Sequence, residues 1–353
     1  MKKLLRAVLI LILIVVLAVG GLLGWLSATE FKPAPVEALD FLTSAGDAGN
    51  TLQTGQNLKV LSWNIGYAGL GAESDFFMDG GKNSVAADKA TVNRYLSEIR
   101  GTISSEAPDL LLLQEVDVKS GRTYGIDESA ALCFGTSVRA LNYSCPFVPV
   151  PFPPIGKVNS GLMTASSYEV SSAERISLPC PFSWPLRIAN LKRCLLVSYL
   201  PLEGTDKQLV LVNLHLEAYD EGAGKIAQTN QLREFIVSEY EKGNYVIAGG
   251  DFNQTFPGSL EIYPILDPTI WSPGVLDESL LPEGWRYVYD NETPSCRLLN
   301  QPYDPTDAEH TQHYVIDGFI LSPNVELTGI STLDLGFAAS DHNPVRLHVI
   351  LNG

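Results

Sequence analysis

The sequence is poor in basic residues. It contains 24 Lys and Arg against 40 Asp and Glu, which gives a formal net charge of −16 over 353 residues. Broad, non-specific binding to nucleic acid depends on Lys and Arg side chains that neutralise phosphates. The charge balance therefore weighs against a nuclease that holds DNA over a wide basic surface, although a local basic patch is still compatible with it.

The sequence also lacks the signatures of several chemistries. None of the five cysteines belongs to a Cys-x-x-Cys pair, and neither Gly-x-Ser-x-Gly nor Ser-x-x-Lys occurs, so no nucleophile motif of these kinds is present. The spacings Cys133/Cys145 and Cys180/Cys194 permit two disulfides outside the cytoplasm, with Cys296 left over. Five buried thiols are the alternative interpretation.

No acidic residue precedes Glu30, and Lys2, Lys3 and Arg6 are the only charged side chains before it. The uncharged run Ala7 to Leu26 is 20 residues long, enough to span a hydrocarbon core of ~30 Å as a helix. We therefore expect residues 1–6 to be a cytoplasmic basic terminus, residues 7–26 a transmembrane anchor, and the rest to lie outside the cytoplasm. A cleaved signal peptide is the alternative, but its apolar region usually has only ~7–15 residues.

Residues 27–56, which include "FKPAPVEALDFLTSAGDAGNTLQTGQ", are small and polar and predict a tether without a strand. Residues 57–353 predict one catalytic domain. Apolar runs predict strands at 58–63, 110–116, 208–216, 245–248, 314–321 and 345–351, and helices are expected at 87–103 and 223–241. Near-continuous apolar strands separated by helices indicate an α/β domain whose sheets are covered on both faces.

The interval from Cys145 to Pro185 is dense in proline and aromatic residues, which predicts neither a central strand nor a helix interior. An irregular surface loop is one interpretation. The other is that Phe147, Phe152 and Trp184 form an exposed apolar rim for a membrane or an amphiphilic substrate.

Polar side chains recur where the apolar strands end: Asn64, Glu115, His215, Asp251, Asn253, Asp317, Asp341 and His342. Each alone has an ordinary structural explanation, but as a set they indicate a ligand site outside the strand ends. Carboxylates and carboxamides suit Mg²⁺, Mn²⁺ or Ca²⁺ rather than zinc. His310 and His313 have no further ligands nearby, and we interpret them as loop residues.

The stretch "VIAGGDFNQ" ends a predicted strand with two glycines. We expect Gly249 and Gly250 to provide backbone without side chains where the strand leaves the sheet, so that Asp251 and Asn253 can approach a ligand closely. The two-residue period of a strand would direct Phe252 into the core. Metal-assisted attack by water is the chemistry that these residue types favour.

In this order, the motifs "LSWNIGY", "PDLLLLQEVD", "VNLHLEA", "VIAGGDFNQ", "YVIDGFILS" and "ASDHNPV" resemble the endonuclease/exonuclease/phosphatase superfamily. The resemblance covers roughly Leu58 to Leu351. It implies a four-layer α/β sandwich of two packed, antiparallel or mixed β-sheets flanked by helices, with one active site at the strand ends.

The resemblance also implies roles for single residues. Glu115 would be the principal Mg²⁺ ligand, with Asn64 and Asp341 beside the metal. Asp251 and Asn253 would position the water and the phosphate. His342, oriented by Asp317, would be a general base or a transition-state stabiliser, and His215 would contact a phosphoryl oxygen or assist the leaving group. Deoxyribonuclease-like members pair the first histidine with a Glu, whereas the corresponding positions here are Asn159 and Ser160.

Three functions are compatible with these features. The favoured one is a membrane-anchored, Mg²⁺-dependent phosphoesterase that acts outside the cytoplasm on a phospholipid headgroup or a small phosphorylated molecule. The second is a surface or secreted nuclease for extracellular nucleic acid. The third is a binding module that has lost catalysis, which the full set of acidic and histidine positions disfavours.

Overall fold

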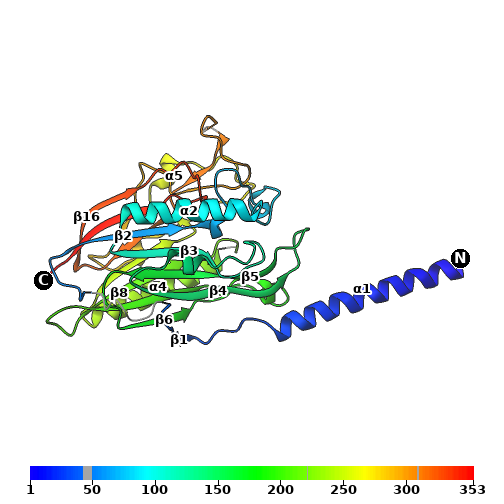
Figure 1. Ribbon diagram of the computed structural model, residues 1–353, viewed down its shortest axis with the longest axis horizontal. Coiled ribbons are helices and arrows are strands. Elements are labelled where there is room, and N and C mark those ends of the chain that lie inside the picture. Colours follow the sequence, from blue (N-terminus) through cyan, green and yellow to red (C-terminus); the bar gives the residue numbers. More distant parts are fainter. Residues whose placement is uncertain (43–49, 221, 308–309) are drawn as a thin grey trace.

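The structure is a computed structural model that describes residues 1–42, 50–220, 222–307 and 310–353. Two β-sheets pack face to face to form the body of the protein, and the long helix α1 (Lys2–Ala28) projects away from it (Figure 1). Helix α2 (Lys89–Glu106) connects the parallel strands of one sheet, and helix α4 (Ala223–Glu241) connects those of the other.

The first sheet has six strands in the order β16-β17-β2-β3-β5-β4. These are β16 (Val325–Thr332), β17 (Val345–Leu351), β2 (Asn57–Asn64), β3 (Leu110–Asp117), β5 (Gly156–Ser166) and β4 (Thr136–Val148). Strands β2 and β3 are parallel and their other neighbours are antiparallel, so the sheet is mixed.

The second sheet has seven strands in the order β1-β6-β7-β8-β9-β15-β12. These are β1 (Val36–Ala38), β6 (Ser172–Ser177), β7 (Cys194–Pro201), β8 (Gln208–His215), β9 (Tyr245–Asp251), β15 (Asp317–Leu321) and β12 (Arg286–Val288). Strands β8 and β9 are parallel, whereas the remaining pairs are antiparallel.

Short elements fill the connections. They are the helices α3 (Glu128–Leu132) and α5 (Ser259–Ile262), the 3₁₀ turns η1 (Gly66–Ala68), η2 (Phe77–Asp79), η3 (Leu186–Ala189) and η4 (Glu278–Leu280), and two strand pairs. The first pair is β10 (Gln254–Thr255) with β11 (Gly274–Val275), and the second is β13 (Cys296–Arg297) with β14 (His313–Tyr314).

Alternation along the strands explains why they are apolar throughout. In β3, Leu110 and Leu112 point into the core between the sheets, whereas Leu111 and Leu113 point outward beneath α2. Helix α2 covers that outer face with Val92, Tyr95, Ile99 and other side chains of one stripe. Helix α4 covers the second sheet in the same way through Leu232 and Ile236. The predicted four-layer α/β sandwich is thus confirmed.

Residues 27–56 differ from the prediction of a tether without a strand. Val36–Ala38 pairs with β6 and adds an edge strand to the second sheet, and Leu52 is fully buried. The prediction failed because β1 is only three residues long and half exposed, so its pattern carries almost no signal. Residues 43–49 of this segment lie outside the described part of the chain.

The interval from Cys145 to Pro185 contains more strand than predicted. It includes the end of β4, all of β5 and β6, and a proline-rich hairpin tip between Val148 and Gly156. Proline is tolerated there because β4 is an edge strand. All five cysteines are free thiols, and the alternative of five buried thiols holds for Cys145, Cys194 and Cys296, whereas Cys133 and Cys180 are partly exposed. Phe152 and Trp184 are exposed, whereas Phe147 packs partly against the cluster around Cys145 and Val148.

A buried amide links the two sheets just below the ends of their parallel strands. Asn213 of β8 donates from Nδ2 to the carbonyl oxygens of Leu113 (3.1 Å) and Met163 (2.9 Å) in the other sheet. Its Oδ1 accepts from Nε2 of Gln114 at 2.8 Å. All these groups are buried, so the bridge fixes the register of one sheet on the other without water.

We predict that Asn213→Ala lowers the free energy of unfolding by at least about 2 kcal/mol, because it leaves the Gln114 amide and two carbonyls without this partner. Urea unfolding of the full-length protein in detergent measures the change. The matched control is Ser198→Ala, since the Ser198 hydroxyl is buried with no hydrogen-bond partner in the described part of the chain. An equal effect of the two substitutions would contradict a special role for the bridge.

Candidate active site

The sheet topology brings the predicted polar residues to one end of the sandwich. Parallel strands β2 and β3 end at Asn64 and near Glu115, and β8 and β9 end at His215 and Asp251, which are register partners. Strand β15 runs antiparallel to β9, so its first residue, Asp317, pairs with Asp251. Asp341 and His342 precede β17, which is antiparallel to β2.

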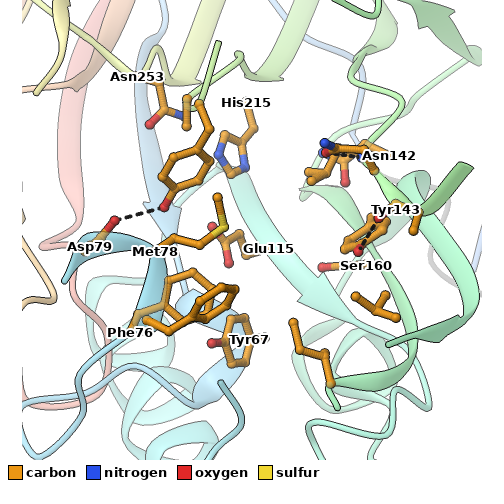
Figure 2. A pocket seen from close by; sticks show the side chains of 18 of the residues that line it. Tyr67, Phe76, Met78, Asp79, Glu115, Asn142, Tyr143, Ser160, His215 and Asn253 are labelled. Carbon is orange, nitrogen blue, oxygen red and sulfur yellow. Dashed lines mark hydrogen bonds between the residues drawn. The ribbon is translucent and has the colours of Figure 1, made fainter. Parts of the chain in front are cut away.

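A cavity of about 570 Å³ opens at this end. Six of the predicted residues line it: Glu115, His215, Asp251, Asn253, Asp341 and His342. Asn64 and Asp317 lie behind this wall and bond to its members. Figure 2 shows Asn253 and His215 at one end, Glu115 in the middle, and Tyr67, Phe76 and Met78 facing Asn142, Tyr143 and Ser160 across the cavity.

His342 and Asp317 form a buried pair between the two sheets. The Nδ1 atom of His342 lies 2.8 Å from Oδ2 of Asp317, and this oxygen also accepts a hydrogen bond from the hydroxyl of Ser295. Burial alone would lower the pKa of His342, but Asp317 and Asp341 raise it well above its ordinary value. The Nε2 atom of His342 is directed toward Asp251 and Asp341 at 3.8 and 3.9 Å and lies 3.4 Å from Nδ2 of Asn64.

Asp251 lies at the centre of the polar groups. Its Oδ2 accepts from Asn64 Nδ2 at 3.0 Å, and its Oδ1 accepts from the backbone N–H of Asn253 at 2.8 Å. Burial and the neighbouring Asp317 raise the pKa of Asp251 to about 7. Asn253 takes a positive φ of 49° and donates from its side chain to the carbonyl of Leu216, so both polar residues face the cavity.

His215 differs from His342 in its surroundings. Its Nε2 lies 3.4 Å from Oδ2 of Asp251, while Nδ1 is buried with no partner among the residues described. Burial and the nearby Arg193 lower the pKa of His215, so the ring is neutral. At the two positions that lack the acid, Asn159 accepts a hydrogen bond from the hydroxyl of Ser144, and Ser160 lines the cavity.

Glu115 owes its position to a break in the strand. The register between β3 and β5 shifts between Leu113 and Val116, and Glu115 takes a positive φ of 55°. Its Oε1 lies 3.4 Å from Asn64 Nδ2. Burial and the charges of Glu115 and Asp79 raise the pKa of Asp341 to about 7, although His342 and Arg297 oppose them. The repulsion among these carboxylates thus outweighs the opposing effect of His342 and Arg297 on the pKa of Asp341.

The donor set fits a divalent metal. The ligand atoms of Asp251, Asp317 and His342 lie within 4.8 Å of one another, as do those of Cys296, Asp341 and His342. All these residues are buried. A cation placed among the carboxylates would relieve their repulsion, and carboxylate oxygen is the ligand that hard divalent ions prefer. The buried Asp and His cluster is therefore suited to a divalent ion.

The prediction that the strand leaves the sheet at Gly249 and Gly250 is wrong. Strand β9 continues through Gly249 and Gly250 to Asp251, so the chain does not leave the sheet there. A Cβ atom on Gly249 would lie 2.3 Å from the ring of Phe319, and one on Gly250 would lie 2.0 Å from the carbonyl oxygen of Leu214. The glycines thus allow close packing inside the sheet. Phe252 is fully buried, as expected.

Sequence reasoning missed several residues of the cavity wall. Arg122 stacks over the ring of Tyr67 at 3.6 Å and forms a two-point ion pair with Asp117 at 2.8 and 2.9 Å. Tyr219 donates from its hydroxyl to Asp79 at 3.0 Å (Figure 2). Tyr67 and Arg122, and likewise Asp79 and Tyr219, are far apart in the sequence and come into contact only in the folded protein, so no motif indicates them. Arg122 and Asp117 are close in sequence.

The remaining histidines lie apart from the cavity. His313 belongs to strand β14 rather than to a loop, and its ring stacks on Phe337 with centroids 5.7 Å apart. His310 pairs with Asp307 at the surface. Neither lines the cavity described above.

Two packed mixed sheets with a cavity at their strand ends define an α/β sandwich whose polar residues meet in a ligand site. The sequence profile of the endonuclease/exonuclease/phosphatase family matches residues 61–342, and the chain belongs to this family. Family membership and the buried Asp and His cluster together make it a phosphoesterase with a site that fits a divalent metal. No curated protein sequence matches the chain.

Solved structures share the fold at low sequence identity. An endonuclease/exonuclease/phosphatase from Beutenbergia cavernae is 17% identical with a TM-score of 0.55, covering 84% of this chain and 72% of that one. A family protein from Leptotrichia buccalis is 13% identical with a TM-score of 0.53 (83% and 99%). ANGEL2, a 2′,3′-cyclic phosphatase, is 16% identical with a TM-score of 0.52 (88% and 100%). These likenesses concern the fold alone.

The buried Asp79 predicts a pH-dependent stability. Burial raises its pKa to about 6 from an ordinary value of 3.8. The folded state therefore binds this proton more tightly than the unfolded state, so its contribution to stability is complete below pH 3.8 and is lost as the pH rises toward 6. At higher pH the ionised carboxylate costs up to about 3 kcal/mol.

We predict that Asp79→Asn, which keeps an acceptor for Tyr219, stabilises the metal-free protein at pH 8 and leaves it unchanged at pH 3.5. Thermal unfolding of full-length protein with chelator at both pH values measures this. Asp206→Asn is the control, because the Asp206 side chain is 86% exposed. A variant that is destabilised at pH 8, or equally shifted at both pH values, would contradict the account of Asp79.

Proposed function

We propose that the protein is a membrane-anchored, divalent-metal-dependent phosphoesterase that hydrolyses a phosphodiester or phosphomonoester outside the cytoplasm. The substrate class that we favour is a phospholipid headgroup or a small phosphorylated molecule. One observation carries the proposal: buried carboxylates and two histidines with opposite pKa shifts converge on a single cavity. Environments that separate the pKa values of neighbouring groups are typical of acid–base sites.

Glu115 and Asp341 are the proposed carboxylate ligands of the metal, and Asn64 holds Glu115 beside it. This oxygen-rich corner suits Mg²⁺, Mn²⁺ or Ca²⁺ better than the groups that contain His342, since those hard ions prefer oxygen and Nδ1 of that ring is bonded to Asp317. When bound, the cation neutralises charge on the phosphoryl oxygens.

Asp251 and Asn253 would position the attacking water. A pKa raised to about 7 makes the Asp251 carboxylate a suitable proton acceptor as the water oxygen bonds to phosphorus and the bond to the leaving oxygen breaks. His342 would stabilise the transition state rather than act as a base, because the neighbouring Asp317 and Asp341 raise its pKa and favour the protonated ring. The neutral His215 would donate a hydrogen bond to a phosphoryl oxygen or to the leaving group.

The membrane location rests on α1. Among the described residues it is the one helix long and apolar enough to cross a membrane, and length and composition alone also fit a signal sequence. Lys2, Lys3 and Arg6 precede the apolar run, and by the positive-inside tendency the domain of an anchored protein would lie outside the cytoplasm. One feature favours a retained anchor over a cleaved signal. Leu26, near the end of the helix, is buried against the catalytic domain.

The proposed activity predicts a defined pattern across substrates. Full-length protein in detergent should hydrolyse p-nitrophenyl phosphate, bis(p-nitrophenyl) phosphate, sphingomyelin or a phosphoinositide with Mg²⁺, and chelator should abolish the reaction. Plasmid nicking without turnover of the other substrates would instead support a nuclease. No metal-dependent reaction on any of them would support a binding module.

His342→Ala should lower the turnover number by about 10²- to 10⁴-fold, because it removes an imidazole that Asp317 holds toward the proposed position of the phosphate. The matched control is His348→Ala on β17, a histidine outside the cavity lining, which should keep the wild-type rate. Circular dichroism shows whether both variants fold. A folded His342→Ala enzyme with a near wild-type rate would mean that the site is misassigned.

A further inference from the structure

The cavity that holds the candidate active site has a second, apolar end. Its lining there comes from three separate segments: Leu23 and Leu26 of α1, Val148, Val150 and Ile155 of the β4–β5 hairpin, and Leu186 and Ile188 of the η3 turn. The membrane-type helix thus forms part of the wall of the same cavity that exposes Glu115 and Asp341. A volume of about 570 Å³ is within the range of small-molecule sites.

The end of α1 is held firmly in this wall. Leu26 packs against Cys145, Val148 and Ile188. The indole of Trp184 donates to the hydroxyl of Ser27 at 3.1 Å. Just after the helix, the buried carboxylate of Glu30 meets Arg187 at 2.9 Å and Lys192 at 3.4 Å. These contacts fix the direction in which the helix leaves the domain.

Exposed apolar side chains surround this exit. We define the apolar rim as Val150, Phe152, Trp184 and Leu186, which are 62, 96, 56 and 67% exposed. Val150 and Leu186 also line the cavity, so the cavity reaches the surface at the rim. The rim is next to the exposed apolar surface of α1, and a bilayer is the partner that covers both together. Tryptophan is typical of the membrane interface.

We propose that the cavity takes a phosphoester with an alkyl or acyl chain, drawn from the bilayer that contains α1. The chain lies against Leu23 and Leu26, and the phosphate reaches Glu115 and Asp341. This inference rests on the proposed phosphoesterase function. It adds that the anchor helix is itself a wall of the substrate site, so that substrate and enzyme share one membrane.

Esters with alkyl chains of two lengths test whether the apolar end of the cavity binds the chain of the substrate. The probes are p-nitrophenyl methyl phosphate and p-nitrophenyl octyl phosphate, hydrolysed by full-length protein in detergent with Mg²⁺. We expect kcat/KM for the octyl ester to exceed that for the methyl ester by at least about tenfold, since each buried methylene group strengthens binding by about fourfold. Leu23→Trp, which fills the apolar end, should remove this preference by lowering kcat/KM for the octyl ester to about the value for the methyl ester.

Leu17→Trp is the matched control, because Leu17 lies on α1 but is 65% exposed and outside the cavity lining. It should keep the preference for the octyl ester. The methyl ester rate shows that each variant is folded. Equal loss of both esters in Leu23→Trp, or an unchanged preference, would overturn the inference. If wild-type protein hydrolyses neither ester, the proposed function itself fails.

The shared membrane is tested with phosphatidylcholine vesicles. Full-length protein is reconstituted, and p-nitrophenyl hexadecyl phosphate is placed either in the same vesicles or in separate ones. Turnover at least about tenfold faster in the same vesicles is the expected result, since the rim would take substrate only from the bilayer of its own anchor. Equal rates in the two arrangements would contradict it.

Discussion

The face-to-face register of the two β-sheets is the constraint on which the site depends. Asn64, Glu115 and His342 belong to the side of the six-stranded sheet, and Asp251 and Asp317 to that of the seven-stranded sheet. Two hydrogen bonds connect these sides at the cavity, from Asn64 to Asp251 at 3.0 Å and between His342 and Asp317 at 2.8 Å. A shift of one sheet on the other would separate every pair, so the apolar core and the Asn213 bridge also set the chemistry.

Much of this arrangement can be predicted from local sequence. Runs such as Leu110 to Leu113 are apolar at every position because alternate side chains enter two different layers, which the sequence pattern already implies. Polar residues placed at the ends of such runs lie at the ends of the strands, which is why Asn64, His215 and Asp251 meet. The predicted helix 223–241 has the observed bounds, and Gly222 and Gly243, both with positive φ, flank its two ends.

The rest depends on contacts between distant segments. Strand β1 forms because β6 offers an open edge, and nothing within Val36–Ala38 indicates this. Gly249 was interpreted as a place where the chain leaves the sheet, yet its reason is the ring of Phe319. Asp79 and Tyr219 are 140 residues apart and carry no motif. The role of the end of α1 is likewise not visible in its own sequence, since it becomes part of the cavity wall only when the β4–β5 hairpin and the η3 turn pack beside it.

The central claim is that the oxygen-rich corner at the strand ends binds the catalytic cation. A crystal structure of the full-length protein grown with Mn²⁺, with anomalous scattering measured to locate the ion, tests it most directly. The account predicts an anomalous peak in contact with the carboxylates of Glu115 and Asp341, and its loss in crystals of Glu115→Gln. A peak at Cys296 and His342 instead, or one that persists in Glu115→Gln, would contradict the account.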